Sequence, residues 1–166
     1  MEIRKLSAYD APIYQKIRLK ALLENPESYS SSYEEEQSRP IEYIEERLSQ
    51  IAVSTFGAFI EDMLVGIVTF VKETRIKTRH TGDLYAMYVD SRYRRQKIGT
   101  ALVNHILSIA KENQVTEKIR LAVTVTNTSA LKLYETLGFK TYCHETKSVK
   151  INDVYYGTYY MEYVIK

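Results

Sequence analysis

Helical periodicity is strongest just past the middle of the chain. Between residues 98 and 113, apolar side chains recur at spacings of three and four, which places them on one face of a helix. The Ser- and Glu-rich segment 27–39 lacks this pattern, and it predicts a surface loop or a marginal helix. Further helices are predicted from an N-cap at Asp10 to Pro26, from Pro40 onward, and over residues 127–137.

Alternation with a period of two marks most of the strands. Two such runs after Ser54 flank Glu61 and Asp62 and predict a hairpin. A helix at 98–113 would join two further strands by a right-handed crossover, so we expect strands 84–89 and 119–125 to lie parallel. The element order β-α-α-β-β-β-α-β-α-β-β predicts a mixed α/β (α+β) fold. Its remaining strands are predicted over 3–6, 138–150 and 154–165.

Length and composition limit the kind of protein that this chain can form. Its 166 residues are expected to fold as one domain, residues 1–166, because a domain takes roughly 150 residues. Hydrophobic residues make up 45% and charged residues 27%, which excludes collagen-like, low-complexity and wholly disordered chains. The net charge of +2 is too small for general nucleic-acid binding, so no nucleic-acid partner is expected, although a local basic patch stays open.

Metal ligands and targeting signals are sparse in the sequence. Cys143 is the single cysteine and forms no internal disulfide, and His80, His105 and His144 lack zinc-ligand spacing, so no metal site is expected. The charged N-terminus does not resemble a signal peptide, and the apolar run 51–60 is far short of the roughly 18 residues that span a membrane. We therefore expect a soluble cytoplasmic protein with no membrane partner.

The residues that carry chemistry gather in VDSRYRRQKIGTAL, a cation-rich loop that leads from a predicted strand into the strongest helix. Unpaired backbone N–H groups and the positive end of the helix dipole meet at such a junction and favour a phosphate. Arg94, Arg95 and Lys97 add positive charge, and Gly99 permits a close backbone approach. Neither a Walker A sequence nor G-x-G-x-x-G is present, which argues against a nucleoside triphosphatase and a Rossmann dehydrogenase. The alternative interpretation is a solvated cationic loop.

Within this loop, YRRQKIGTAL resembles the pyrophosphate-binding motif of the GCN5-related N-acetyltransferases (GNAT), Q/R-x-x-G-x-G/A. In the register that we prefer, Arg94 opens the motif and Gly99 is its last glycine, while Arg95 and Lys97 replace the earlier glycines. A second register, which opens at Gln96, fits the letters of the pattern without exception. In either register the expected binding depends on backbone amides and charge.

A second segment, NTSALKLYETLGF, is similar to the family signature N-x-x-A-x-x-L-Y-x-x-x-G-F. Asn127 is expected to cap a helix and to offer its amide to the cofactor, and Gly138 is expected to end that helix. Helix punctuation and packing alone would also explain these residues, and a tyrosine on a helix, such as Tyr134, is commonly buried. Because the two motifs occur together at the family's separation, the chain is identified as resembling a bacterial-type GNAT member of unassigned substrate.

The resemblance implies the GNAT fold, a mixed and mostly antiparallel sheet of about seven strands with a central parallel pair that splays apart, flanked by about four helices. It also implies acetyl-CoA as cosubstrate, with a pantetheine arm that pairs with backbone at a bulge in strand 84–89. A Met87 N–H would then lie near the thioester oxygen, and Tyr134 would act as general acid toward sulfur. The residues implied to bind the cofactor are Met87, Tyr88, Val89, Arg94, Arg95, Gln96, Lys97, Ile98, Gly99, Thr100, Asn127 and Tyr134.

The implied reaction is direct attack by a primary amine, which must first lose a proton because a lysine-like amine has a pKa near 10.4. Asp83 lies six residues before Val89, where histone-acetylating members of the family carry a glutamate, and it is the predicted catalytic base. Tyr85 on the same strand face is the fallback, and a strand-initiating turn is the structural alternative for Asp83. Either a cationic acceptor or bulk solvent would face the glutamates Glu34, Glu35, Glu36, Glu42, Glu45 and Glu46.

The sequence leaves other functions open. The chain would serve as a non-catalytic sensor of acyl-CoA or CoA, or as an interaction module, if the site binds without turnover. A basic nucleic-acid binder would use Arg92, Arg94, Arg95 and Lys97. The C-terminal tyrosines, Tyr155, Tyr156, Tyr159, Tyr160 and Tyr163, would pack a core, line an acceptor cleft or form a homodimer surface. The acceptor amine, on a small molecule or a peptide, is not predicted.

Overall fold

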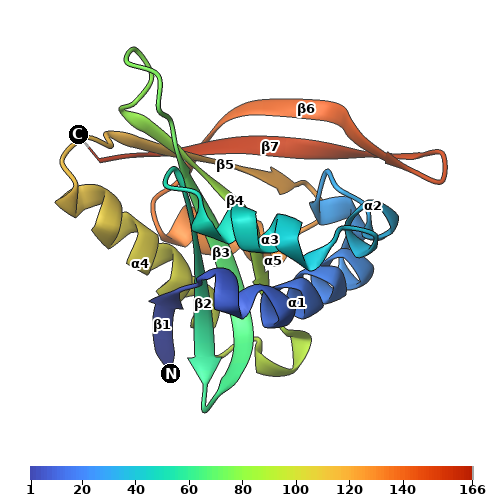
Figure 1. Cartoon of the computed structure of the whole chain (residues 1–166). Helices are drawn as coiled ribbons and strands as arrows, with labels where there is room; N and C mark the ends of the chain where they lie inside the picture. The colour runs from blue at the N-terminus through green and yellow to red at the C-terminus, as the bar shows by residue number, and fades with distance from the viewer. Residues whose placement is uncertain (166) are drawn as a thin grey trace.

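Seven strands form one mixed sheet in the order β1-β2-β3-β4-β5-β7-β6 in the computed structural model, which describes residues 1–165 (Figure 1). Neighbouring strands are antiparallel, except that β4 and β5 are parallel as predicted. The sheet therefore confirms the predicted fold class. The strands are β1 (Glu2–Lys5), β2 (Val53–Ile60), β3 (Met63–Lys72), β4 (Thr81–Val89), β5 (Lys118–Thr124), β6 (Lys140–Ile151) and β7 (Val154–Val164).

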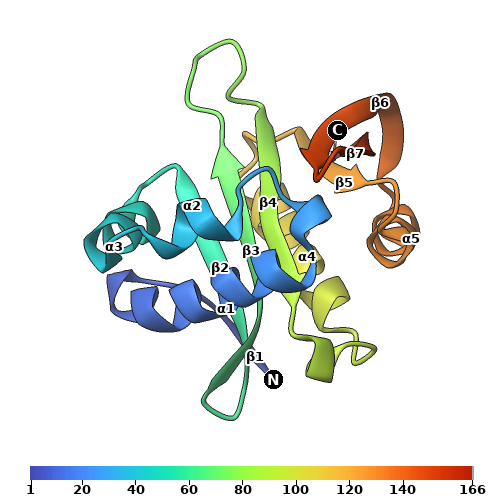
Figure 2. The ribbon, with the colours of Figure 1, turned by 90° about the vertical axis from the view of Figure 1, so that its right-hand side faces the viewer.

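Helices cover both faces of the sheet (Figure 2). One apolar cluster joins the helices α1 and α3 to β2, β3 and β4, and a second joins α4 and α5 to the opposite face. The helices are α1 (Ala11–Glu24), α2 (Tyr33–Gln37), α3 (Ile41–Ser49), α4 (Ile98–Glu112) and α5 (Thr128–Thr136). Three short 3-10 turns are η1 (Ala8–Asp10), η2 (Pro26–Ser28) and η3 (Ser91–Tyr93). The segment 27–39, predicted as a loop or marginal helix, contains η2 and the five-residue α2.

The apolar stripe of α4 anchors the part of the sheet that carries the predicted site. Leu102, Val103 and Ile106 are fully buried on this helix, as the period of the sequence predicts. Each such side chain contributes about 1.5–3 kcal/mol when it leaves water. This packing fixes the N-terminus of α4 beside the end of β4.

One predicted helix cap differs from the observed geometry. The helix α1 does begin after Asp10, but the Asp10 carboxylate bonds residues that precede it. Oδ1 accepts a 2.7 Å hydrogen bond from Arg4, and Oδ2 accepts a 2.8 Å bond from the Ser7 backbone N–H. The side chain therefore closes the turn between β1 and α1 instead of capping the first turn of α1.

The two parallel strands separate after a short stretch of pairing. They pair from Thr81 opposite Lys118 to Leu84 opposite Leu121, and β4 then loses contact with the β5 ladder. On its other side, Tyr85 pairs with Thr69 and Tyr88 with Ile67, so three steps along β4 match two steps along β3. This mismatch is the expected β-bulge, and Ala86 within it has a left-handed φ of 51°. Backbone groups of both strands are thus open toward the gap beyond Leu84, which we name the splay.

Candidate active site

The loop before α4 has backbone geometry that suits an anion. Arg95 and Lys97 have left-handed φ angles of 63° and 60°, and Lys97 is the N-cap of α4. The N–H groups of residues 98–100 belong to the first turn of the helix and have no carbonyl four residues earlier to bond. They are left to bind an anion at the positive end of the helix dipole. The two left-handed positions are those where the family pattern has glycine, which favours the register that opens at Arg94.

We expect Lys97→Gly to stabilise the protein by about 0–1 kcal/mol, because relief of a left-handed strain of roughly 1–2 kcal/mol exceeds the entropy cost of glycine. The matched control is Lys97→Ala, which removes the same charge and keeps the strained Cβ. Both variants should weaken acetyl-CoA binding to a similar extent. Denaturant unfolding and calorimetry check the two effects, and an alanine variant more stable than the glycine variant would contradict the strain.

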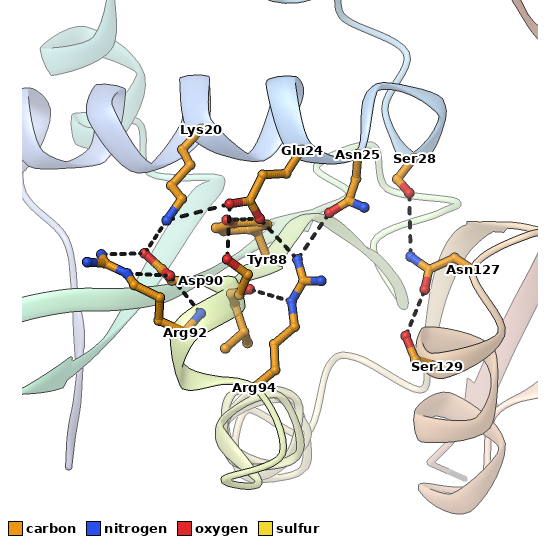
Figure 3. Close-up of polar contacts among 12 residues, drawn as sticks. Lys20, Glu24, Asn25, Ser28, Tyr88, Asp90, Arg92, Arg94, Asn127 and Ser129 are labelled. Atoms are coloured by element: carbon orange, nitrogen blue, oxygen red, sulfur yellow. Dashed lines mark hydrogen bonds and ion pairs between the residues drawn. The ribbon is translucent and has the colours of Figure 1, made fainter.

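Two carboxylates hold this loop against α1 (Figure 3). Asp90 accepts hydrogen bonds of 3.1 and 3.0 Å from the Arg92 guanidinium and of 2.8 Å from Lys20. These donors, Arg92 first, hold the pKa of Asp90 well below its usual range. Glu24 accepts a 2.8 Å hydrogen bond from the hydroxyl of Tyr88, and burial together with this bond raises the pKa of that hydroxyl. The Tyr88 side chain therefore anchors β4 to α1, while its backbone lies at the bulge.

Arg94 also bonds protein groups. Its Nε donates to the Val89 carbonyl at 3.1 Å, and its Nη2 lies 3.1 Å from Asn25 Oδ1 and 3.4 Å from Glu24 (Figure 3). Arg92 and Arg94 are thus engaged by neighbouring groups, whereas Arg95 and Lys97 are exposed and have no ion-pair partner within residues 1–165. This pairing reduces the number of cations that a nucleic-acid interface at this loop would have.

Residues predicted from the two motifs meet beside the bulge. A Cβ on Gly99 would lie 3.0 Å from Leu133 Cδ1 and 3.0 Å from Met87 Cε, so α4, α5 and β4 converge there. Asn127 caps α5 as predicted, since its Oδ1 accepts a 3.1 Å hydrogen bond from the Ala130 N–H. Its Nδ2 lies 3.4 Å from the hydroxyl of Ser28, so the amide faces η2 in this structure (Figure 3).

Tyr134 reaches the same region from α5. Its side chain is 5% exposed, and its ring meets the ring of Phe139 edge-on with centroids 5.7 Å apart. Within residues 1–165 no group hydrogen-bonds the Tyr134 hydroxyl. Burial, with a smaller effect of nearby Tyr29, raises the pKa of that hydroxyl well above its ordinary value of 10.0. Tyr134 therefore stays protonated near neutral pH and is a hydrogen-bond donor without a partner in the protein.

The predicted bases face a polar part of the sheet. Both carboxylate oxygens of Asp83 accept hydrogen bonds from Arg120, at 2.9 and 2.8 Å. Tyr85, the fallback, is 52% exposed, and burial together with the charge of Asp83 raises the pKa of its hydroxyl. A raised pKa makes a tyrosine a poorer base at neutral pH. The catalytic role of Asp83 stays a prediction, because this geometry also gives it a structural partner.

The segment from η2 to Tyr29 crosses the splay, and no motif in the sequence indicated it. The Tyr29 hydroxyl donates to the Met87 carbonyl at 3.0 Å, and the Thr124 hydroxyl donates to the Glu27 carbonyl at 2.7 Å. These two bonds tie the segment to β4 on one side and to the end of β5 on the other. Glu27 is half-buried, and its carboxylate has no hydrogen-bond or ion-pair partner within residues 1–165. The sequence predicted only that a helix ends at Pro26 and that a loop or marginal helix follows.

Some of the residues predicted for an acidic surface or for the tyrosine-rich strands are buried, and others make polar contacts. Glu36 is buried and paired with Arg18, so it is not part of a solvated acidic face. Tyr163 packs on Phe139 with ring centroids 5.5 Å apart, whereas the Tyr160 hydroxyl donates to Glu145 at 2.8 Å. Tyr163 thus belongs to the core, and Tyr160 makes a polar contact instead.

The described part of the chain has neither a group of metal ligands nor a membrane-spanning helix. In residues 1–165, no group of three or more His, Cys, Asp or Glu side chains is placed to hold a metal ion. The longest described helices are also too short or too polar to cross a membrane.

The sequence of this chain matches a family of known proteins. The sequence model described as Acetyltransferase (GNAT) family matches residues 19–139. N-alpha-acetyltransferase 30 of Xenopus laevis is 38% identical over 84 residues, which are 51% of this chain and 30% of that protein. L-amino acid N-acetyltransferase AaaT of Escherichia coli is 28% identical over 118 residues, 70% of this chain and 72% of that protein. The chain thus spans less than a third of the length of the first of these relatives.

Solved structures share the fold over the whole chain. A GNAT acetyltransferase from Streptococcus pneumoniae superposes with a TM-score of 0.84 at 23% identity, covering 99% of both chains. The yncA structure from Salmonella typhimurium, described with its cofactor acetyl-CoA, gives a TM-score of 0.80 at 14% identity and covers 100% of this chain and 94% of that one. At these identities the likeness supports the fold alone.

Proposed function

The chain belongs to the acetyltransferase (GNAT) family, which uses acetyl-CoA, and on that premise we propose that it acetylates the α-amino group of an amino acid or a polypeptide N-terminus. One observation carries the proposal: the first turn of α4 meets the bulge of β4 where Gly99 faces Met87, and Tyr134 interacts with Tyr29, which bonds Met87. The choice of α-amino acceptors follows the names of the relatives, which are an N-alpha-acetyltransferase and an L-amino acid N-acetyltransferase.

An α-amino acceptor also suits the groups near the splay. The α-amino group of a polypeptide N-terminus has a pKa of about 7.7–8.0, so roughly a third of it is neutral at pH 7.5, whereas a lysine-like amine is only about 0.1% neutral. Two carboxylates are candidates for the base: Asp83, which is engaged by Arg120, and Glu27, whose carboxylate has no hydrogen-bond or ion-pair partner within residues 1–165. A weak base therefore suffices for this acceptor.

The residues would divide the work of transfer as follows. Amides of residues 98–100, with Arg95 and Lys97, would hold the pyrophosphate, and backbone groups at 87–89 that face away from β3 would pair with the pantetheine arm. Acetyl-CoA supplies an acetyl group that is activated as a thioester. The Met87 N–H would donate to the thioester oxygen as charge develops, and the Tyr134 O–H would donate to the leaving sulfur. The proton lost by the attacking nitrogen would pass to a carboxylate or to water.

An acceptor panel tests the proposal. The wild-type protein is incubated with acetyl-CoA and amino acids, peptides with free or formyl-blocked N-termini, and polyamines. We expect CoA release with a mass increase of one acetyl group on amino acids or free N-termini, and none on blocked peptides. Binding of acetyl-CoA without turnover on any amine would instead support the sensor alternative, and preferential acetylation of polyamines would contradict the α-amino acceptor.

The base is tested by comparing Glu27→Gln with Asp83→Asn. Glu27→Gln should lower kcat/KM by about 10- to 100-fold at pH 6.5, where the α-amine is mostly protonated, and the loss should shrink as pH rises past about 8. Asp83→Asn should mainly lower stability, because it weakens the pair with Arg120. Rate profiles and unfolding curves of both variants check this. A pH-dependent rate loss confined to Asp83→Asn would return the base to Asp83.

A further inference from the structure

The bulge of β4 holds a backbone shape that needs outside support. Ala86 has a φ of 51°, which an L-residue rarely adopts, and the register with β3 skips from Tyr85 to Tyr88. Pairing with β5 has already ended at Leu84, so no neighbouring strand fixes this stretch from that side. A strained conformation persists where the surroundings determine it. The Tyr29 hydroxyl supplies such a restraint, since it donates to the Met87 carbonyl at 3.0 Å.

Tyr29 is in turn held by a buried ion pair. Arg18 Nε and Nη2 donate to the two carboxylate oxygens of Glu36 at 3.1 and 2.9 Å. The side chains of Arg18 and Glu36 are only 9% and 10% exposed, and Arg18 Cζ lies 4.6 Å from the centroid of the Tyr29 ring. The planar guanidinium thus joins α1 to α2 by its edge and to Tyr29 by its face.

Stability alone does not account for this arrangement. A buried ion pair contributes little net stability compared with apolar side chains of the same volume, whereas it fixes the position of its neighbours. Burial also raises the pKa of Tyr29 to about 12, so the hydroxyl remains a donor to the Met87 carbonyl throughout the neutral range. The contacts therefore form one chain from Glu36 through Arg18 and Tyr29 to the bulge.

We propose that Tyr29 is a positioning residue for acetyl transfer, and that the Arg18–Glu36 pair acts through it to set the backbone of Met87. The inference rests on the proposed function, since the Met87 backbone matters for rate only if the thioester lies beside it. Tyr29 aligns the bulge without exchanging a proton with either substrate. The same segment also bonds the end of β5 through Glu27. It therefore keeps the two edges of the splay, where acetyl-CoA and the acceptor would meet, in a fixed position.

The test is a double-mutant cycle on turnover. Tyr29→Phe removes the hydroxyl and keeps the ring over Arg18, and it should lower kcat roughly 3- to 10-fold, the worth of one hydrogen bond. The dissociation constant of acetyl-CoA should change less than about twofold, because the pyrophosphate amides are untouched. Arg18→Lys keeps the charge and loses the planar stack and the bidentate pair. It should lower kcat by a similar factor in the wild-type background and have no further effect on kcat in the Tyr29→Phe background.

A second arginine–tyrosine stack provides the matched control. Arg39 Cζ lies 4.8 Å from the Tyr43 ring centroid, and its Nη1 donates to the Tyr43 hydroxyl at 3.2 Å, but this pair is on the α2–α3 side and its bond does not reach β4. Arg39→Lys and Tyr43→Phe should leave kcat unchanged within about twofold. Thermal unfolding of every variant separates a loss of folded protein from a loss of rate.

A readout independent of turnover completes the test. Hydrogen exchange of the segment 81–93 should become faster in Tyr29→Phe, because the bulge loses its restraint, and it should stay as in wild type in Tyr43→Phe. Additive effects of Tyr29→Phe and Arg18→Lys on kcat, or unchanged exchange in Tyr29→Phe, would overturn the positioning role. A wild-type protein that transfers no acetyl group would instead contradict the proposed function, and the exchange comparison would still decide whether Tyr29 holds the bulge.

Discussion

Gly99→Asp is expected to abolish measurable acetyl-CoA binding. The new carboxylate would stand in the first turn of α4, where the amides of residues 98–100 are left open for an anion. Two unit charges about 4 Å apart repel by about 4 kcal/mol at an effective dielectric constant near 20, which corresponds to roughly a thousandfold loss of affinity. Isothermal calorimetry with acetyl-CoA measures this effect directly.

The structure adds a stability cost to this substitution and a way to separate it. A Cβ at Gly99 lies 3.0 Å from side-chain carbons of Leu133 and Met87, so the variant must displace both and bring a charge toward apolar groups. Gly99→Asn has the same bulk without the charge and should lose similar stability. Its affinity should exceed that of Gly99→Asp by about 10²-fold or more. Equal affinities of the two folded variants would show that bulk, not charge, closes the site, and would remove the phosphate assignment.

Elements with a local signal were predictable from the sequence. The helix α4, the hairpin at Glu61 and the parallel pair β4–β5 follow from the spacing of apolar residues and the rule for crossovers. The left-handed backbone at Arg95 and Lys97 was not predicted, although the resemblance marks both as positions where glycine is usual. Backbone geometry of this kind depends on a few consecutive residues, so a single sequence contains most of the information.

Contacts between distant residues were not predictable in the same way. Tyr29 meets Met87 across 58 positions, and Tyr88 meets Glu24 across 64, with no periodicity that links the partners. Asp83 was predicted as base from the family resemblance and its strand face, but no local pattern indicated that Arg120, 37 positions later, would hold both of its oxygens. Such pairs depend on the packing of whole elements, and a single sequence carries no local pattern that would indicate them.

Arg94 was predicted to bind the cofactor, and in the structure its guanidinium bonds groups of the protein. The motif predicts that it binds pyrophosphate from the loop before α4, and in the structure its guanidinium donates to Val89, Asn25 and Glu24. Its contribution to acetyl-CoA binding would then come from fixing the loop as well as from its charge. Charge alone, read from the sequence, does not distinguish these two roles.

The second large effect is expected from Tyr134→Phe. The change removes one hydroxyl and keeps a ring that packs on Phe139, and within residues 1–165 that hydroxyl has no partner to lose. Stability and the affinity for acetyl-CoA should therefore change little. The rate constant kcat should fall by roughly 10²–10³-fold, the usual worth of a donor placed where charge develops in the transition state. The matched control is Tyr163→Phe, which alters the other tyrosine on Phe139 and should leave kcat unchanged.

The pH profile separates this role from packing. Burial raises the pKa of Tyr134 above its ordinary 10.0, so the donor form persists to higher pH than a solvent-exposed tyrosine allows. In the wild type, the fall of kcat that follows ionisation of this hydroxyl should therefore begin only above pH of about 10. Phenylalanine has no hydroxyl proton to lose. The pH profile of Tyr134→Phe should therefore show the lower kcat at every pH, without this fall at high pH. Turnover equal to wild type in Tyr134→Phe, or a rate loss that only matches a loss of folded protein, would assign the side chain to the core.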